Sequence, residues 1–110
     1  MKTVLVTGGN KGIGLETTRL FLEEGYRVAV VARDFGASPL IAGDNLALYP
    51  FDLTKTGDIP RLVSEIGPVD ILVNNAGVMF SLPWDDYPQE RIDYMIALNI
   101  AAPVALIREI

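Results

Sequence analysis

The sequence predicts an α/β domain with a parallel sheet of about four strands, in the order 3-2-1-4, and helices on both faces. Short apolar runs typical of buried strands alternate with segments whose apolar residues recur at helical spacing. Strands that alternate with helices form parallel sheets through right-handed crossovers. Half of the 110 residues are apolar, enough for one modest core, so we expect residues 1–110 to form a single domain.

The N-terminal part is predicted as strand, helix and strand. Residues 3–7 (TVLVT) form the first strand, because β-branched residues precede two glycines. A helix follows, with residues at helical spacing from Ile13 to Phe21, and Gly25 is expected to end it. Residues 27–32 (RVAVVA) form the second strand, which is apolar on both faces as in a sheet covered on both sides.

The middle of the chain contributes two more strands. Residues 35–45 contain glycine, proline and aspartate and are predicted to be mostly loop. Residues 46–51 (LALYPF) form the third strand, and Pro50 favours a sheet edge because proline cannot donate to a ladder. Residues 58–66 form a short helix, and residues 69–74 (VDILVN) form the fourth strand.

The last predicted element is a helix from about residue 88 to the end. Asn99 lies on its apolar stripe, so we expect Asn99 to face inward and to need hydrogen-bond partners. Pro103 has no N–H for the carbonyl of Asn99, which predicts a kink between these two residues. The stripe consists of Ile92, Met95, Ile96, Asn99, Ile100, Leu106, Ile107 and Ile110.

The composition excludes several kinds of chemistry. The chain has no cysteine and no histidine, which excludes disulfides, thiolate catalysis, Cys/His zinc sites and histidine general-base catalysis. A net charge of −5 argues against general nucleic-acid binding, which requires a basic face. No apolar run reaches the length of about 18 residues that suggests a membrane span, and no signal peptide is recognisable, so we expect a soluble, cytoplasmic chain.

The segment from Thr7 to Gly14 (TGGNKGIG) joins the first strand to the first helix. Glycines there permit a sharp turn, a close approach of the backbone to a pyrophosphate, and close packing of helix on strand. The helix N-terminus adds free N–H groups and a partial positive charge. The segment therefore predicts a Rossmann-type dinucleotide site, with a plain strand-to-helix turn as the alternative. A P-loop is excluded, because Leu15 and Glu16 follow Gly14.

The pattern Thr7-Gly8-x-x-x-Gly12-x-Gly14 resembles the cofactor motif of the short-chain dehydrogenase/reductase family. Residues 74–77 (NNAG) resemble a second motif of that family, at the end of the fourth strand where the family has it. The resemblance covers the entire chain but only about the first half of a typical member. A methyltransferase-like Rossmann domain is a minor alternative, which NNAG and Arg33 disfavour.

The resemblance also implies which residues contact the cofactor. Asp52 and Leu53 follow the third strand, where the family usually has an aspartate that contacts adenine. Asn99 stands where the family has an asparagine of its catalytic tetrad. The implied cofactor-binding residues are Gly8, Asn10, Lys11, Gly12, Ile13, Gly14, Arg33, Asp52, Leu53, Asn75, Ala76 and Gly77.

The end of the second strand bears on the choice of dinucleotide. An acidic residue there normally bonds the ribose 2′-OH of NAD, but this chain has Arg33, followed by Asp34. An arginine pairs with a 2′-phosphate and stacks on adenine, and Lys11 supplies a second charge. TGGNKGIG followed by ARD also resembles the NADPH-dependent carbonyl reductases of the family. We therefore expect NADP(H), with NAD(H) bound through Asp34 as the alternative.

Two interpretations of Asn99 remain open. In the family, this asparagine takes part in a proton relay through its main-chain carbonyl and a bound water. The absence of an N–H on Pro103 leaves that carbonyl free for such a water. The alternative is a structural amide whose side chain ties the strand to the helix.

The family's hydride chemistry also needs a serine and a Tyr-x-x-x-Lys pair, in which the lysine lowers the tyrosine pKa. The lysines here are Lys2, Lys11 and Lys55, and none lies four residues after a tyrosine. The chain also ends at Ile110 inside an apolar helix. We therefore expect a truncated chain or fragment that does not reduce carbonyl substrates by itself. Whether it is an enzyme stays open, and a non-catalytic nucleotide-binding or oligomerisation module is the alternative.

A homo-oligomer is expected from the same observation. In the family, a fifth strand pairs with the fourth, and without it residues 71–73 form an unpaired apolar edge. The stripe of the last helix is then exposed as well. Such surfaces favour pairing with another copy. Residues 81–84 (SLPW) are interpreted as a surface loop, with a border of the substrate site as the alternative.

Overall fold

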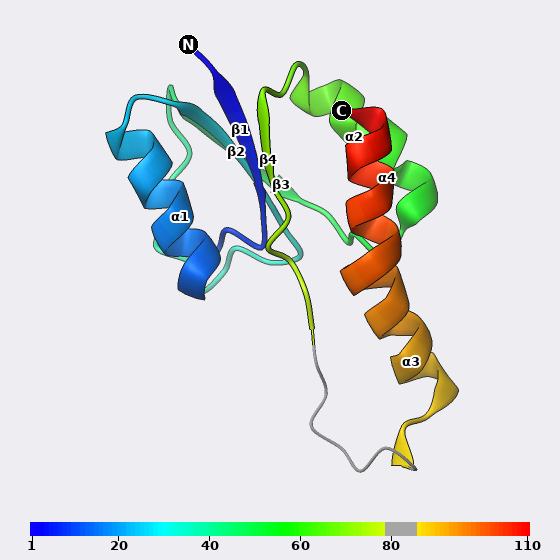
Figure 1. The fold of residues 1–110 in the computed structure, drawn as a ribbon. Coiled ribbons are helices and arrows are strands. Elements are labelled where there is room, and N and C mark those ends of the chain that lie inside the picture. The colour runs from blue at the N-terminus through cyan, green and yellow to red at the C-terminus, as the bar shows by residue number, and fades with distance from the viewer. Residues whose placement is uncertain (79–85) are drawn as a thin grey trace.

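The computed structural model describes residues 1–78 and 86–110, which contain a four-stranded parallel sheet (Figure 1). Its strands are β1 (Thr3–Thr7), β2 (Arg27–Ala32), β3 (Leu46–Pro50) and β4 (Ile71–Val73). Their order is β3-β2-β1-β4, and every neighbouring pair is parallel. The predicted order 3-2-1-4 is therefore confirmed.

Both edge strands differ slightly from their predicted bounds. β3 is an edge strand, as Pro50 predicted, and Pro50 ends the register opposite Ala32. β4 keeps three residues of the predicted range 69–74. Asp70 precedes it and is joined to Thr3, whose N–H donates to the Asp70 carboxylate at 2.8 Å. Asn74 already belongs to the turn that follows the strand.

Helices cover both faces of the sheet. Figure 1 shows α1 (Gly12–Glu23) on one side and α2 (Ile59–Ile66) with α4 (Ala102–Glu109) on the other. A short 3-10 turn, η1 (Thr56–Asp58), precedes α2 and replaces the start of the predicted helix 58–66. The predicted loop at residues 35–45 contains no helix or strand.

The core has two layers because successive strand residues point to opposite faces. Leu5 and Val31 pack with Ile59 and Leu106 from α2 and α4. On the other face, buried valines of β1 and β2 contact Phe21 of α1. The apolar character of both strand faces thus reflects burial on both sides, as the sequence predicted.

The C-terminal helix is irregular at the predicted place. It consists of α3 (Gln89–Ile96), a π-helical turn η3 (Ala97–Ala101) and α4. The N–H of Ala102 donates to the carbonyl of Ala97, five residues earlier. The interruption expected between Asn99 and Pro103 therefore takes the form of a π turn.

Apart from Leu106, the predicted stripe does not form the packed face of this helix, so the expectation that it faces inward is wrong, whereas the expectation that it is exposed is confirmed. Ala102, Ala105 and Leu106 are buried, whereas four large aliphatic residues are 49–63% exposed and Asn99 is exposed. The helix carries apolar residues on nearly all sides, so their spacing alone did not select a face. The small alanine side chains let α4 approach the sheet and α2 closely, so the helix packs through the face that carries the alanines. The four exposed residues are Ile96, Ile100, Val104 and Ile107.

No helix within residues 1–78 and 86–110 has both the length and the apolarity needed to cross a bilayer.

Candidate functional site

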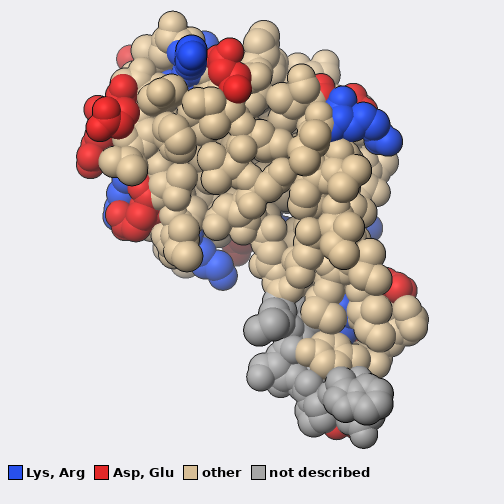
Figure 2. Space-filling view, viewed as in Figure 1, with Lys and Arg blue, Asp and Glu red and all other residues tan. Residues whose placement is uncertain are grey.

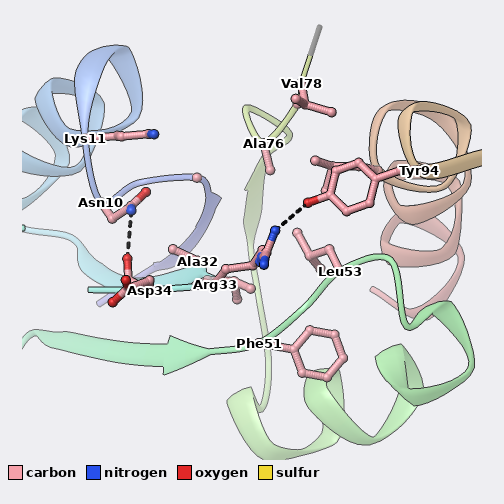
Figure 3. Close-up of a pocket in the computed structure, with 14 residues that line it drawn as sticks. Asn10, Lys11, Ala32, Arg33, Asp34, Phe51, Leu53, Ala76, Val78 and Tyr94 are labelled. Atoms are coloured by element: carbon pink, nitrogen blue, oxygen red, sulfur yellow. Dashed lines mark hydrogen bonds between the residues drawn. The ribbon is translucent and has the colours of Figure 1, made fainter. Parts of the chain in front are cut away.

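A cavity of about 420 Å³ lies at the carboxyl ends of the strands, the usual position of a ligand in an open parallel sheet. Its walls come from the glycine segment, the ends of β2 and β3, the turn after β4, and the start of the C-terminal helix (Figure 3). The lining residues are Gly8, Asn10, Lys11, Val31, Ala32, Arg33, Asp34, Phe51, Leu53, Ala76, Gly77, Val78, Tyr94 and Leu98.

The glycine segment has the close contacts that its composition predicts. Gly8 has φ +67° and Gly12 has φ +57°, a region that residues with a side chain rarely adopt. A Cβ on Gly14 would collide with the carbonyl oxygen of Gly8. At Gly12 the same added atom would meet open space, so the backbone there is accessible to a ligand.

Thr7 joins the glycine segment to the NNAG turn. Its hydroxyl accepts hydrogen bonds from the N–H groups of Asn75 at 3.1 Å and Ala76 at 3.0 Å. The side chain of Asn75 in turn donates to the carbonyl of Gly8 at 3.1 Å. Thr7 is 2% exposed, so these bonds hold the ends of β1 and β4 together inside the fold. The sequence placed Thr7 in a motif but did not predict this bridging role.

Asn99 is held at the opposite side of the NNAG turn. Its side-chain oxygen accepts from the N–H of Val78 at 2.8 Å, and its side-chain nitrogen donates to the carbonyl of Val78 at 2.7 Å. The expectation that Asn99 is buried is wrong, but its side chain has partners. These bonds are the ones that the structural interpretation required.

Arg33 and Tyr94 meet across the cavity. Nη1 of Arg33 donates to the hydroxyl of Tyr94 at 2.9 Å, and Figure 3 shows the two side chains pointing toward one another. This bond, with a smaller effect of the Asp52 carboxylate, raises the pKa of Arg33 above its usual value. Tyr94 was not predicted as a site residue. It belongs to no motif, and on the expected helix it only lies one turn before Leu98, another residue of the cavity wall.

The glycine segment is also tied to the end of β2. The side-chain nitrogen of Asn10 donates to the main-chain carbonyl of Asp34 at 2.9 Å. The carboxylate of Asp34 accepts from the N–H of Gly36 at 2.7 Å, so it is engaged with its own loop. Lys11 is the exposed residue immediately before α1, and Figure 3 shows it on the same side of the cavity as Asn10.

Asp52 and Leu53 have different environments. The carboxylate of Asp52 accepts from the hydroxyl of Thr54 at 2.7 Å and from its N–H at 3.0 Å. The hydroxyl bond is the main reason that the pKa of Asp52 lies below its ordinary value, and the positive charge of Arg33 acts in the same direction. Leu53 is 4% exposed and forms an apolar wall of the cavity with Phe51.

The cavity brings together about half of the predicted site residues. Those that line it are Gly8, Asn10, Lys11, Arg33, Leu53, Ala76 and Gly77. Those that do not line it are Gly12, Ile13, Gly14, Asp52, Asn75 and Asn99. Ile13 is 80% exposed on α1. Residues 81–84 lie outside the described residues.

A parallel 3-2-1-4 sheet with a glycine segment after its first strand defines a Rossmann-type α/β protein. The sequence profile described as short chain dehydrogenase matches residues 2–110. The chain belongs to this family. It is 33% identical to a D-beta-hydroxybutyrate dehydrogenase of Rhizobium meliloti (strain 1021), over 97% of the chain and 46% of that protein. It is also 33% identical to a glucose 1-dehydrogenase of Gluconobacter oxydans (strain 621H), over 99% of the chain and 45% of that protein.

Solved structures agree with this assignment. A mutant of 4-hydroxyisoleucine dehydrogenase complexed with NADH and succinate matches with a TM-score of 0.90 and 28% identity, over 98% of the chain and 47% of that structure. A metagenomic short-chain oxidoreductase in complex with NADP matches with a TM-score of 0.85 and 31% identity, over 98% of the chain and 54% of that structure. The chain thus spans about half the length of the relatives that it matches.

Proposed function

We propose that this chain is the NADP(H)-binding portion of a short-chain dehydrogenase/reductase. The reaction of the whole protein would be hydride transfer between the nicotinamide cofactor and a carbonyl or alcohol substrate. The main observation in favour is the cavity at the strand ends, where Arg33 lines the same space as Lys11 of the glycine segment. The structural relatives support a nicotinamide cofactor, since three of them are complexes with NADH, NADPH or NADP.

The residues present fit such a cofactor. The open backbone at Gly12 and the N-terminus of the twelve-residue helix α1 suit a pyrophosphate. The apolar side chains of Phe51, Leu53 and Leu98 suit an adenine ring. A bound nicotinamide would supply or accept the hydride, and the role of these residues is to bind and orient it.

The choice of NADP(H) over NAD(H) rests on charge. Arg33 and Lys11 both line the cavity, and each offers a positive group for a 2′-phosphate. Asp34, the residue that would bond the 2′-OH of NAD, also lines the cavity, and one of its carboxylate oxygens already accepts the N–H of Gly36. NAD(H) stays the alternative, and it is supported by the NADH complexes among the relatives.

For Asn99 we propose a part in the proton relay of the whole protein. Its side chain is occupied by Val78, and its main-chain carbonyl lacks the N–H donor that a residue other than Pro103 would give. That carbonyl is therefore suited to hold a water molecule at the edge of the site. The cofactor contacts proposed for Asp52 and Asn75 are indirect in this arrangement, because each positions a neighbouring loop.

A non-catalytic or oligomerisation module is the second candidate. It is favoured by the exposed aliphatic residues of the C-terminal helix. We propose self-association through the β4 edge or this helix. Figure 2 shows surface without charged side chains over β4 and the front of α4, which suits such a contact. The cytoplasmic location stays a prediction.

Cofactor titration tests the first proposal. Calorimetry should give tighter binding of NADPH than of NADH to the chain. Arg33→Ala and Lys11→Ala should each lower the affinity for NADPH about tenfold, since each removes a charge-assisted bond. Neither substitution should change the affinity for NADH by more than about twofold.

Arg61→Ala is the matched control for this titration. Arg61 is an exposed arginine of α2 that pairs with Glu65 at 3.8 Å and does not line the cavity. Its replacement should leave both affinities unchanged. The assignment of the 2′-phosphate is wrong if neither Arg33→Ala nor Lys11→Ala acts selectively on NADPH. The proposed function fails if the unmodified chain binds neither nucleotide.

A further inference from the structure

The bond between Arg33 and Tyr94 joins two walls of the cavity. Arg33 follows β2, whereas Tyr94 lies on α3, 61 residues later in the sequence. Both side chains line the cavity, and the 2.9 Å bond holds the guanidinium above the space between them (Figure 3). Tyr94 therefore determines where the charge of Arg33 stands in the absence of a ligand.

Without such a partner, Arg33 would have a wide choice of positions. It is exposed at the end of a strand, and a long arginine side chain loses much rotamer entropy when it is fixed in one position. None of the ion pairs within residues 1–78 and 86–110 includes Arg33, although Asp34 is adjacent in the sequence. Its described side-chain hydrogen bond is the one to Tyr94.

The chemistry of the partner matters as much as its position. A phenol hydroxyl accepts one hydrogen bond and is neutral, so it fixes the guanidinium without cancelling its charge. Nη1 uses one N–H for this bond, and arginine has five, so a second edge of the guanidinium stays available for an anion. A carboxylate in the same place would hold Arg33 equally well but would compete with a phosphate.

Resting on the proposed NADP(H) binding, we propose that Tyr94 is a positioning residue for 2′-phosphate recognition, which holds the Arg33 guanidinium over the cavity and leaves its charge free for the phosphate. Part of the ordering of Arg33 is then complete before the cofactor arrives, and preorganisation of this kind increases affinity. The effect is confined to ligands that carry a 2′-phosphate, because it acts through Arg33.

The test uses two small probes that lack the nicotinamide half. Adenosine 2′,5′-bisphosphate carries the 2′-phosphate, and adenosine 5′-monophosphate does not. Calorimetry on Tyr94→Phe should give an affinity for the bisphosphate about three- to tenfold below that of the unmodified chain, the range expected for one hydrogen bond. The affinity for the monophosphate should stay within about twofold.

Further variants separate positioning from a general structural effect. In an Arg33→Ala background, Tyr94→Phe should have no additional effect on the bisphosphate, because the two residues act as one unit. Tyr94→Glu should lower the affinity for the bisphosphate more than Tyr94→Phe does, since a carboxylate compensates the positive charge of Arg33. Tyr26→Phe is the matched control, because Tyr26 packs against Phe21, away from the cavity. Circular dichroism melting verifies that every variant is folded.

The outcomes are distinct. An equal loss for both probes, an unchanged affinity for the bisphosphate, or a gain in it would overturn the role of Tyr94, provided that the unmodified chain prefers the bisphosphate. An additional loss from Tyr94→Phe in the Arg33→Ala background would also overturn it. If the unmodified chain shows no preference for the 2′-phosphate, the proposed NADP(H) binding fails first, and the role of Tyr94 fails with it.

Discussion

At the scale of single residues, the site depends on a few polar side chains that connect distant parts of the chain. Thr7 bonds two N–H groups of the NNAG turn, and Asn99 bonds both polar main-chain groups of Val78. These bonds satisfy main-chain groups that follow the end of β4 and therefore take no part in the hydrogen bonds of the sheet. Because Thr7 is 2% exposed, water cannot easily replace its hydroxyl.

We therefore expect Thr7→Val to destabilise the fold by about 1–3 kcal/mol, because it keeps the shape of the side chain but leaves two donors without an acceptor. Urea unfolding monitored by circular dichroism measures the change. Thr17→Val is the matched control, since Thr17 only donates to the carbonyl of Ile13 within α1 at 2.8 Å, and it should change stability by about 0.5 kcal/mol or less. Equal effects of the two substitutions would contradict the bridging role of Thr7.

At the scale of elements, the C-terminal helix is the one that connects the core to the site. Its α4 part packs Ala102, Ala105 and Leu106 into the core, and its α3 part brings Tyr94 to the cavity. The π turn between them contains Asn99. π turns inside α-helices occur often at functional sites, and here the turn lies where Pro103 interrupts the regular hydrogen-bond pattern.

The packed face of α4 can be tested with two adjacent residues. Leu106 is 1% exposed and Ile107 is 63% exposed, although both belong to the predicted stripe. Leu106→Ala should cost about 2–5 kcal/mol of unfolding free energy through the cavity that it leaves. Ile107→Ala should cost about 0.5 kcal/mol or less at low protein concentration. Denaturant midpoints of the two variants measure this difference, and similar values would mean that the stripe expected from the sequence is the packed face.

At the scale of the whole molecule, the chain presents two apolar surfaces. β4 is an edge strand, and the aliphatic residues Ile96, Ile100, Val104 and Ile107 are exposed on the C-terminal helix. The chain spans about half of each relative that it matches, so these surfaces are described for this portion alone. Exposed edges and aliphatic rows both favour association with a further chain.

We expect light scattering to detect a dimer or larger assembly of this chain whose population rises with concentration. Ile100→Lys should dissociate it if the helix forms the contact, because a buried unpaired charge is costly. Ile13→Lys is the matched control, since Ile13 is 80% exposed on α1, and it should leave the assembly intact. Persistence of the assembly in Ile100→Lys would assign the contact to β4, and a monomer at high concentration would contradict self-association.

Most of the fold could be predicted because its signals are local. The strand at residues 3–7, the strand at residues 27–32 and the edge position of Pro50 follow from the residue types within each segment. The bounds of β4 were less accurate. The strand ends before Asn74 because the following residues bond to Thr7 of β1, and these are long-range contacts that the local sequence does not reveal. The packed face of the last helix was predicted wrongly, because alanines that pack closely carry a weaker hydrophobic signal than the isoleucines that stay exposed.

By itself, the sequence determined the order of strands and helices, the position of the glycine segment, and the placement of Arg33 and Lys11 at the ends of their elements. Periodicity, turn chemistry and the parallel sheet that alternation implies are sufficient for these. Only the tertiary structure decided that Tyr94 meets Arg33, that Thr7 bridges to Asn75 and Ala76, and that α4 packs through its alanines. The two sets of hydrogen bonds join residues 61 to 69 positions apart, so their formation depends on how layers pack rather than on any local pattern.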